Sequence, residues 1–426
     1  MPATSILSMS RWGRPLDGAG AEVRLAAMGQ SAMANSVVAG TEVAFISDRA
    51  AFDALEDDWN RLFLRAGRST QYFQTFNWLW HWSNHYLSAA ATSRASTRLA
   101  IVTVRRHGEL VLVWPLVMER TAGLDCLTWM GGAVTQYGDI LVDPAADDSM
   151  ELIRTSWDCI LARLAPDIVR LRKVRDDAAI APFLAQIGAT ESERQSAPYL
   201  DLESAPDFET YEQRYSAKAR KNRRRQMRRL DERGRAHFSS DRGGAVAREL
   251  ARLALLLKLA WLKDRGLVSP ALADHRMTGF FADVAECRLR DTGCRVSALT
   301  SAGEAAAIEI AFECKGRRLV HVIVYGLKFD KAGAGNLLVE ESVRRAKAEG
   351  IETFDLLAPG DAYKVDWADG SVGVADYAVP VSWAGRAYTA LYLGAVRKCL
   401  KTGLAAMPAS LRRVVASGYR VVLAIV

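Results

Sequence analysis

The sequence lacks the features that mark membrane-spanning and zinc-binding proteins. No apolar run reaches the roughly 18 residues that a transmembrane helix needs, and the apolar C-terminal stretch Val421–Val426 is far shorter. The chain has six cysteines, and no two of them form a CxxC pair. We therefore predict no zinc site and no other bound metal. Most of the cysteines lie in apolar stretches, which favours buried free thiols in a reducing, cytoplasmic compartment.

Residues 1–40 lack both a regular hydrophobic pattern and the hydrophobic core of a signal peptide. They are rich in Ala, Ser, Gly and Met. We predict a disordered N-terminal extension. Met33 is an alternative start of the protein, because regular patterns begin soon after it.

The remaining composition is that of a globular protein with more than one domain. Of 426 residues, 50% are hydrophobic and 25% are charged, and a chain of this length exceeds one usual core. The net charge of +7 is concentrated between Arg214 and Arg235, where the local charge is +9. The rest of the chain is close to neutral, so the basicity belongs to one segment.

Two halves of the chain show the same order of elements. Each reads as strand, two helices, three strands, helix, strand, small helix and last strand, which predicts a duplicated α+β unit with a mixed sheet. The predicted divisions are an extension (1–40), a first unit (41–205), a second unit (206–385) and a basic amphipathic helical tail (386–426). Three predicted elements matter below: one strand over Leu110–Glu119, a short strand over Tyr199–Leu202, and a long helix over Phe208–Arg233.

The most informative stretch of the second half runs from Tyr325 to Gly350. An apolar strand, Leu319–Tyr325, leads into a loop with Gly333 and Gly335, and a helix follows at once. Glycines let backbone N–H groups approach a ligand, and a helix start carries partial positive charge. A phosphate or pyrophosphate suits such a place. The alternative is an ordinary turn between a strand and a helix.

Three stretches resemble a known family. They are SAKARKNRRRQMRRLDERG (Ser216–Gly234), VIVYGLKFDKAGAGNLLVEESVRRAKAEG (Val322–Gly350) and FDLLAPGDAYKVDW (Phe354–Trp367). Together with the order of elements they resemble the GNAT acetyltransferase superfamily. The closer resemblance is to the GNAT-like family of the cellulose-biosynthesis protein CelD/BcsL, which is related to the FemAB aminoacyl transferases. That family usually has Ser-Pro-Gly in the loop, where this chain has Gly333, Ala334 and Gly335.

The resemblance implies tandem GNAT-like units and an acyltransferase that uses acetyl-CoA or another acyl-CoA. In that fold the loop and the helix start hold the pyrophosphate of acetyl-CoA. The backbone N–H groups expected to do so here belong to Gly333, Ala334, Gly335, Asn336, Leu337 and Leu338. A strand N–H near Val324 is expected to hydrogen-bond the thioester oxygen.

Several side chains are candidates for the chemistry. His321, Tyr325, Glu309 and Asp355 are the candidate general bases. For Glu309 the alternative is a solvated strand face, and for His321 a structural role. Asp355 has the alternative of hydrogen-bonding neighbouring backbone. Lys364 is expected to neutralise a phosphate or an oxyanion, and by resemblance to FemAB-type enzymes it lies near the transfer site; the alternative is a surface lysine.

The acceptor is expected between the two halves. Tyr363, Trp367, Gln136 and Tyr137 are candidates to contact it. The first half has the sequence VDPAADDSMEL (Val142–Leu152) where the glycine loop would be, and its aspartates would repel a pyrophosphate. We therefore expect a single cofactor site, in the second half. A helix rich in tryptophan over Phe76–Leu87 is expected to pack in the core, with sugar stacking as the alternative.

The sequence does not determine which partner the basic segment binds. Eight of the twelve residues in Lys218–Arg229 are basic, which suits a CoA phosphate, an anionic acceptor, a membrane surface or nucleic acid. No specific nucleic-acid motif accompanies it. The favoured prediction is an acyl-CoA-dependent N- or O-acetyltransferase acting on a sugar, polysaccharide or cell-envelope precursor. It would be cytoplasmic, with peripheral contact to the inner membrane through this segment and the tail. The alternatives are a non-catalytic assembly protein for exopolysaccharide synthesis and a FemAB-like aminoacyl-tRNA-dependent transferase.

Overall fold

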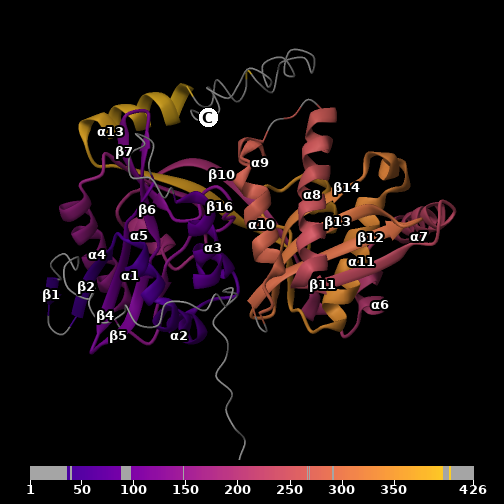
Figure 1. Cartoon of the computed structure of the whole chain (residues 1–426), viewed down its shortest axis with the longest axis horizontal. Helices are drawn as coiled ribbons and strands as arrows, with labels where there is room; N and C mark the ends of the chain where they lie inside the picture. The colour runs from indigo at the N-terminus through magenta and orange to yellow at the C-terminus, as the bar shows by residue number, and fades with distance from the viewer. Residues whose placement is uncertain are drawn as a thin grey trace, which may run out of the picture.

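The computed structural model describes residues 36–38, 41–87, 97–146, 148–265, 267, 269–289, 292–396 and 403. The fold is of the predicted α+β class, and the two halves of the chain lie side by side (Figure 1). No helix in these residues is long and apolar enough to cross a membrane. Most of the predicted disordered extension lies outside the described residues, but residues 36–38 form a strand.

Two sheets organise the described part of the chain. The smaller sheet is antiparallel, in the order β1 (Ser36–Val38), β2 (Thr41–Ile46), β4 (Ile101–Arg106), β5 (Glu109–Trp114) and β8 (Leu141–Val142). The larger sheet is mixed, in the order β11 (His237–Arg242), β12 (Thr292–Ser301), β13 (Glu304–Cys314), β14 (Arg317–Tyr325), β15 (Thr353–Asp355), β10 (Thr190–Asp201), β16 (Gly370–Pro380), β9 (Ile168–Arg175), β7 (Leu124–Trp129), β6 (Leu116–Thr121) and β3 (Arg98–Leu99).

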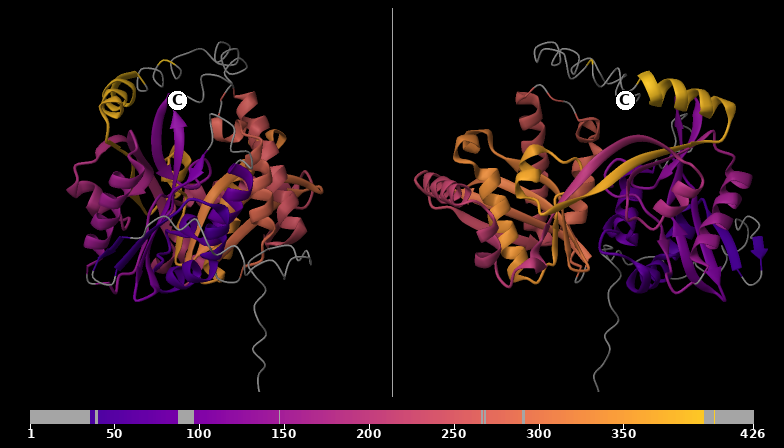
Figure 2. Two further views of the ribbon diagram at one scale, coloured as in Figure 1. Left: turned by 60° about the vertical axis from the view of Figure 1, so that its left-hand side comes forward. Right: turned by 180° about the vertical axis from the view of Figure 1, so that it is seen from behind.

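The last strands of the two halves tie them together. β10 ends the first half but pairs with β15 of the second, and β16 ends the second half but pairs with β9 of the first. Figure 2 shows β10 and β16 as long strands that run from one half into the other. The predicted boundary at residues 205 and 206 therefore does not separate the sheets, and the domain ranges stay a prediction.

Helices cover the sheets on both faces. Those of the first half are α1 (Arg49–Ala54), α2 (Glu56–Ala66), α3 (Phe76–Tyr86), α4 (Ser149–Leu164) and α5 (Ala181–Gln186). Those that follow are α6 (Phe208–Tyr211), α7 (Ala217–Asp231), α8 (Gly244–Asp264), α9 (Pro270–Ala273), α10 (Arg276–Glu286), α11 (Ala334–Ala348), α12 (Ala362–Trp367) and α13 (Trp383–Ala387). In the second half, α8 and α10 contact strands β12 to β14, and side chains of α11 pack against the opposite face of the same strands.

One hydrophobic core is shared by the two halves. Trp78 of α3 is fully buried and packs against Phe280 of α10 and Phe312 of β13, with ring centroids 4.7 and 5.0 Å away. Trp82 and Tyr86 on the same helix are also buried. The tryptophan-rich helix is thus a core element, as predicted, and its buried rings are not available to stack on a sugar. Truncating a side chain such as Trp78 typically costs about 3–5 kcal/mol.

Three predicted elements are wrong in detail. The short strand predicted over Tyr199–Leu202 is the end of a longer strand, β10 (Thr190–Asp201). The strand predicted over Leu110–Glu119 is two strands in different sheets, because Pro115 lacks the N–H group that would continue the ladder. The helix predicted over Phe208–Arg233 is broken before α7. Ser216 begins the new helix by accepting a hydrogen bond from the N–H of Ala219.

The chain after β16 starts as helix. α13 continues into a π-helix, η5 (Tyr388–Val396). With the exception of residue 403, the rest of the predicted helical tail lies outside the described residues.

Candidate functional site

A cavity of about 510 Å³ opens beside the glycine loop. Its lining includes six of the residues predicted to take part in catalysis or cofactor binding, together with Tyr363, and brings in others from α7, α8 and the start of α12. The lining residues are Gln226, Lys258, Trp261, Ile323, Val324, Tyr325, Asp330, Gly333, Ala334, Gly335, Asn336, Asp361 and Tyr363. The volume lies in the usual range of small-molecule sites.

One wall of the cavity is an edge of β14. This strand pairs with β15 only over Arg317–Leu319, and among the described residues its later part has no strand partner on that side. Lys258 of α8 donates a hydrogen bond from Nζ to the carbonyl oxygen of Ile323, 3.5 Å away, on this edge. The edge therefore offers unpaired backbone groups to an extended ligand.

The register corrects the predicted role of Val324. Val324 pairs with Ile308 of β13, and the N–H of Gly326 donates to the carbonyl of Ala306 in the same direction. Because backbone groups alternate along a strand, the N–H of Val324 faces β13 and is not on the cavity edge. The N–H groups on the edge are those of Ile323 and Tyr325.

The other wall is the N-terminus of α11. Gly333 precedes the helix in the left-handed conformation (φ 71°), and no side chain caps the helix. The first-turn N–H groups of an α-helix have no partner within the helix, so those of Ala334, Gly335 and Asn336 are available to a ligand. A Cβ atom on Gly333 would come within 2.2 Å of the Gln226 side chain, so this close approach needs glycine.

Leu337 and Leu338, the last two residues whose N–H groups were predicted to hold the pyrophosphate, lie deeper in the protein than the cavity wall. Leu337 and Leu338 are fully buried, and the N–H of Leu337 already donates to the carbonyl of Gly333 at 3.2 Å. Their backbone belongs to the helix interior and their side chains to the core. The geometry thus limits the backbone N–H groups available to a pyrophosphate to those of the residues before Leu337.

Helix α8 supplies side chains that sequence reasoning missed. The ammonium group of Lys258 lies 4.7 Å from the centre of the Trp261 ring, and the guanidinium of Arg265, the residue after α8, lies 4.1 Å from it. Arg265 also donates a hydrogen bond to the hydroxyl of Tyr325 at 3.2 Å. Burial lowers the pKa of Lys258. No pattern in the sequence marked these residues, because basic residues next to leucines are ordinary on an amphipathic helix.

Glu309 is fully buried on the α11 face of β13, so the alternative of a solvated strand face is wrong. Ser342 of α11 donates to its Oε1 at 2.6 Å, and Oε2 has no hydrogen-bond partner among the described residues. Burial raises the pKa of this carboxyl to about 7. That value suits a general base, but Glu309 does not line the cavity.

His321 lies at a bulge of β14, between the residues that pair with Ile310 and Ala311. Its ring contacts the aromatic side chains of Phe281 and Phe312. Nε2 lies 2.8 Å from the carbonyl oxygen of Val134, so this nitrogen carries the proton and Nδ1 is left without a partner. Burial lowers the pKa of His321 to about 4, which makes it a weak base.

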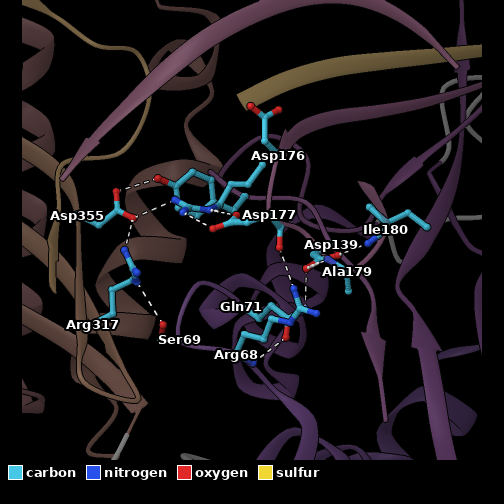
Figure 3. Close-up of polar contacts among 12 residues, drawn as sticks. Arg68, Ser69, Gln71, Asp139, Asp176, Asp177, Ala179, Ile180, Arg317 and Asp355 are labelled. Carbon is cyan, nitrogen blue, oxygen red and sulfur yellow. Dashed lines mark hydrogen bonds and ion pairs between the residues drawn. The ribbon is translucent and has the colours of Figure 1, made fainter. Parts of the chain in front are cut away.

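Asp355 joins the two halves. It is fully buried and accepts hydrogen bonds from the hydroxyl of Tyr137 at 2.8 Å, from Arg317 at 3.1 Å and from Arg175 at 3.3 Å (Figure 3). The N–H of Leu357 also donates to it at 2.9 Å. The geometry argues against the predicted catalytic role of Asp355 and against a substrate contact by Tyr137, because these contacts occupy both groups.

The same network extends to the loop before α3. Arg317 also donates to the hydroxyl of Ser69, and Arg68 donates to the carbonyl of Asp177 (Figure 3). Asp139 is buried nearby and accepts from Gln71 and from the backbone at Ala179 and Ile180. Within this polar layer, Asp355 and Arg317 are the residues that join the second half to the first.

The remaining predicted residues lie around the junction. Lys364 is buried and not a surface lysine, and Gln136 accepts a hydrogen bond from Lys173 at 2.8 Å. Trp367 is buried against Arg223, whose guanidinium lies 4.9 Å from the ring centre. Arg223 also pairs with Glu340 of α11, which docks the basic helix and argues against a substrate contact by Trp367.

A comparison with protein families matches part of the second half of the chain. Residues 217–365 match the model of the acetyltransferase (GNAT) domain family. The matched segment contains α7, the cavity and most of α12. No curated protein matches the chain.

Three solved structures illustrate the likeness in fold. A tandem GNAT protein from the clavulanic acid biosynthesis pathway is 16% identical, with 80% of this chain and 99% of that chain covered and a TM-score of 0.46. FemX is 9% identical, with 69% and 90% covered and a TM-score of 0.48. The C-terminal domain of a putative lysylphosphatidylglycerol synthetase from Agrobacterium fabrum is 11% identical, with 77% and 92% covered and a TM-score of 0.44. At these low identities the likeness concerns the fold alone. The family match shows that residues 217–365 are similar to the GNAT acetyltransferase domain.

Proposed function

We propose that the chain is an acyl-CoA-dependent N- or O-acyltransferase with one acyl-CoA site, in the second half. The observation that carries the proposal is the cavity between the free edge of β14 and the uncapped N-terminus of α11. This cavity lies within the segment similar to the GNAT acetyltransferase domain. Acetyl-CoA is the proposed acyl donor.

The two walls suit the two parts of such a donor. The N–H groups of Ala334, Gly335 and Asn336 suit the pyrophosphate, because they add to the positive end of the helix. The edge of β14 suits an extended chain with amide groups, which can pair with a strand as another strand does. The N–H of Tyr325 then donates to the thioester oxygen, which gains negative charge during acyl transfer.

The reaction joins the acceptor to the acyl carbon. The nitrogen or oxygen of the acceptor forms the new bond to the thioester carbon, the carbon–sulfur bond breaks, and the CoA sulfur leaves as a thiolate that takes up a proton. We assign the proton acceptor to Asp361. Its carboxylate lines the cavity and makes no hydrogen bond or ion pair within the described part of the chain.

The proposed acceptor is a sugar, a polysaccharide or a cell-envelope precursor. The resemblance of the three stretches to the CelD/BcsL-type family supports this class. Turnover of acetyl-CoA should be screened against amino sugars, nucleotide sugars and exopolysaccharide fragments. The Asp361→Asn variant should lower turnover with the best acceptor by about 100-fold or more while acetyl-CoA still binds. Unchanged turnover would remove Asp361 from the mechanism.

Calorimetric titration with acetyl-CoA tests the central claim. We expect one site per chain, with saturation below about 1 mM, in the usual range for enzyme substrates. The absence of both heat and a thermal shift at that concentration would overturn the acyltransferase proposal. A stoichiometry near two would contradict the restriction to the second half.

The basic face of α7 supports one alternative. Arg224, Arg225 and Arg229 are exposed, and the buried Arg223 leaves them facing away from the core. Such a face suits an anionic partner, namely a membrane surface or the RNA of an aminoacyl-tRNA-dependent transferase. RNA affinity that falls steeply with salt, by close to one log unit per log salt for each phosphate contact, would favour the transferase.

A further inference from the structure

The helix that follows β16 carries almost no charge. α13 and η5 together span Trp383–Val396, and Arg386 is the only charged residue in this stretch of the sequence. A helix on the surface of a globular protein normally has charged or polar residues on its outer side. The outer side of this helix therefore lacks the residues that usually face water.

The inner side of the helix is fixed on the first half. The hydroxyl of Ser382 donates to Oδ1 of Asp167 at 2.6 Å and accepts from the N–H of Gly385 at 3.1 Å. A Cβ atom on Gly385 would collide with the carbonyl oxygen of Asp167, so the close approach of the helix needs glycine. Further along, Leu393 is buried in a cluster with Ile168 of β9. The exposure of the outer side therefore does not result from loose packing.

The outer side presents two large apolar side chains. Trp383 is 83% exposed and Leu391 is 67% exposed. They share this side with smaller residues at a spacing of three or four along the helix, and the exposed set is Trp383, Arg386, Ala387, Ala390, Leu391 and Gly394. Such spacing places side chains on one face of a helix. An exposed apolar face of this kind marks contact with a partner or a membrane.

The sequence around this face is basic. Residues 377–426 contain seven lysine and arginine residues and no aspartate or glutamate. Apolar and aromatic side chains together with positive charge are the features that bind a helix to the surface of an anionic membrane. Tryptophan in particular favours the boundary between lipid and water. A second copy of the chain would bring the same positive charge to the contact and is disfavoured by repulsion.

This face is separate from the basic face of α7. In Figures 1 and 2, α13 and η5 lie at the outer edge of the first half, and α7 lies at the far end of the second. α7 is described throughout, and its exposed residues are mostly lysine and arginine, with no large apolar side chain among them. α7 thus offers charge alone, whereas the face of α13 and η5 offers apolar side chains in a basic segment.

We propose that the outer face of α13 and η5 docks on a membrane surface that contains anionic lipids. Trp383 and Leu391 enter the boundary between headgroups and acyl chains, and Arg386 lies at the level of the headgroups. The basic residues that follow in the sequence add attraction to the anionic lipids. The proposal does not rest on the acyltransferase function, because no residue of the cavity takes part in it.

Sedimentation with lipid vesicles tests the proposal on the full chain. Vesicles of phosphatidylcholine are compared with vesicles in which about one third of the lipid is phosphatidylglycerol. We expect affinity at least about tenfold higher for the anionic vesicles, with the difference lost at high salt. Leu391→Glu should weaken this binding by about tenfold or more, because it places a charge in the apolar boundary.

The matched control is Leu64→Glu. Leu64 is also 67% exposed, and it belongs to α2, which lies on the opposite side of the first half from α13 (Figure 1). Its substitution should change nothing. Three results would overturn the proposal: no binding to the anionic vesicles, undiminished binding in Leu391→Glu, or an equal loss in Leu64→Glu. Trp383→Glu repeats the test at the other end of the face should Leu391→Glu fail to fold.

Fluorine NMR identifies what covers the face. The full chain is labelled with 5-fluorotryptophan, and the resonance of Trp383 is the one missing from Trp383→Phe. We expect a soluble paramagnetic agent to broaden this resonance without vesicles at every protein concentration, and anionic vesicles to protect it. Protection without vesicles would overturn the proposal. If that protection is independent of protein concentration, residues 397–426 cover the face, and if it grows with concentration, a second copy does.

Discussion

The two halves differ most at the turn where a strand leads into a helix. In the second half, β14 leads to α11 through Gly333, and no side chain caps the helix. In the first half, β8 leads to α4, and the helix start is preceded by Asp148, which pairs with Arg106 at 2.6 Å. Asp143 accepts from the N–H of Ala145 in the same turn.

This difference shows how one topology serves two purposes. The strand order β2-β4-β5-β8 of the first half repeats the order β11-β12-β13-β14 of the second. Both helices present a positive N-terminus. In the first half, carboxylates already neutralise it, and Arg106 holds the pKa of Asp148 below its usual value, so the group stays ionised. Neither helix start is capped by a side-chain hydrogen bond, so the difference between the halves is the negative charge that precedes α4, and not the topology.

The largest effect is expected from removing the carboxylate of Asp355, which forms ion pairs with one arginine from each half. Asp355→Ala leaves Arg175 and Arg317 buried without their shared carboxylate. Breaking a buried ion pair in this way costs about 3–5 kcal/mol, measured as the free energy of unfolding in denaturant. Asp176→Ala, which removes an exposed pair with Arg194, is the matched control and should cost less than about 1 kcal/mol. Equal losses in the two variants would show that Asp355 does not tie the halves together.

The second test places a carboxylate at the start of α11, as in the first half a carboxylate precedes α4. Gly335→Asp places a carboxylate at the start of α11, where the phosphates of acetyl-CoA are proposed to lie. We expect affinity to fall by about 100-fold or more, equivalent to about 2.7 kcal/mol, by calorimetry. Ala348→Asp adds the same charge at the exposed end of the same helix and should leave the affinity unchanged. Undiminished binding in Gly335→Asp would place the donor elsewhere.

The third test uses a buried carboxyl of the second half. The pKa of Glu309 is about 7 in the folded protein and ordinarily about 4.3 when unfolded, so the folded state binds an extra proton between these values. Its stabilising contribution is complete below about pH 4.3 and is lost as pH rises through about 7. Between pH 5.5 and 8 the wild type should lose about 2 kcal/mol of stability relative to Glu309→Gln. The exposed Glu304→Gln should follow the wild type, and parallel curves for all three would refute a raised pKa.

The smallest effect is expected at the wall that α8 contributes. Lys258→Met removes an ammonium group from the cavity but keeps a side chain of similar length over Trp261. Acetyl-CoA affinity should fall roughly fivefold, or about 1 kcal/mol, because one partly screened contact is lost. Lys263→Met on the same helix is the control. A loss in both variants alike would indicate a general charge effect and not a cavity contact.

The sequence predicted most elements, and the cavity lies beside the glycine loop that it singled out. The α+β class, the repeated order of elements and the loop at Gly333 follow from hydrophobic periodicity and glycine placement, which are local properties. Local properties did not reveal that β10 and β16 cross between halves. They also did not predict that Val324 faces β13, since a strand's register depends on its partner.

The candidate site was predicted less completely than the fold. Tyr325, Tyr363 and the loop residues before Leu337 do line the cavity, whereas Asp355, Tyr137 and Trp367 are engaged in the core. A polar residue in an apolar strand produces the same sequence pattern whether its side chain faces a cavity or a buried arginine. Lys258 and Trp261 were missed because only the packing of α8 on β14 brings them to the loop.

By itself the sequence determined the class of the fold, the single glycine loop and the concentration of positive charge in one segment. These depend on residue type and spacing along the chain. Only the tertiary structure decided which groups are paired and which are left over. It joins Asp355 to arginines from both halves, and it leaves Oε2 of the buried Glu309 without a hydrogen-bond partner among the described residues. The physical reason is that burial and pairing depend on contacts between residues distant in sequence, and these exist only after the halves have packed together.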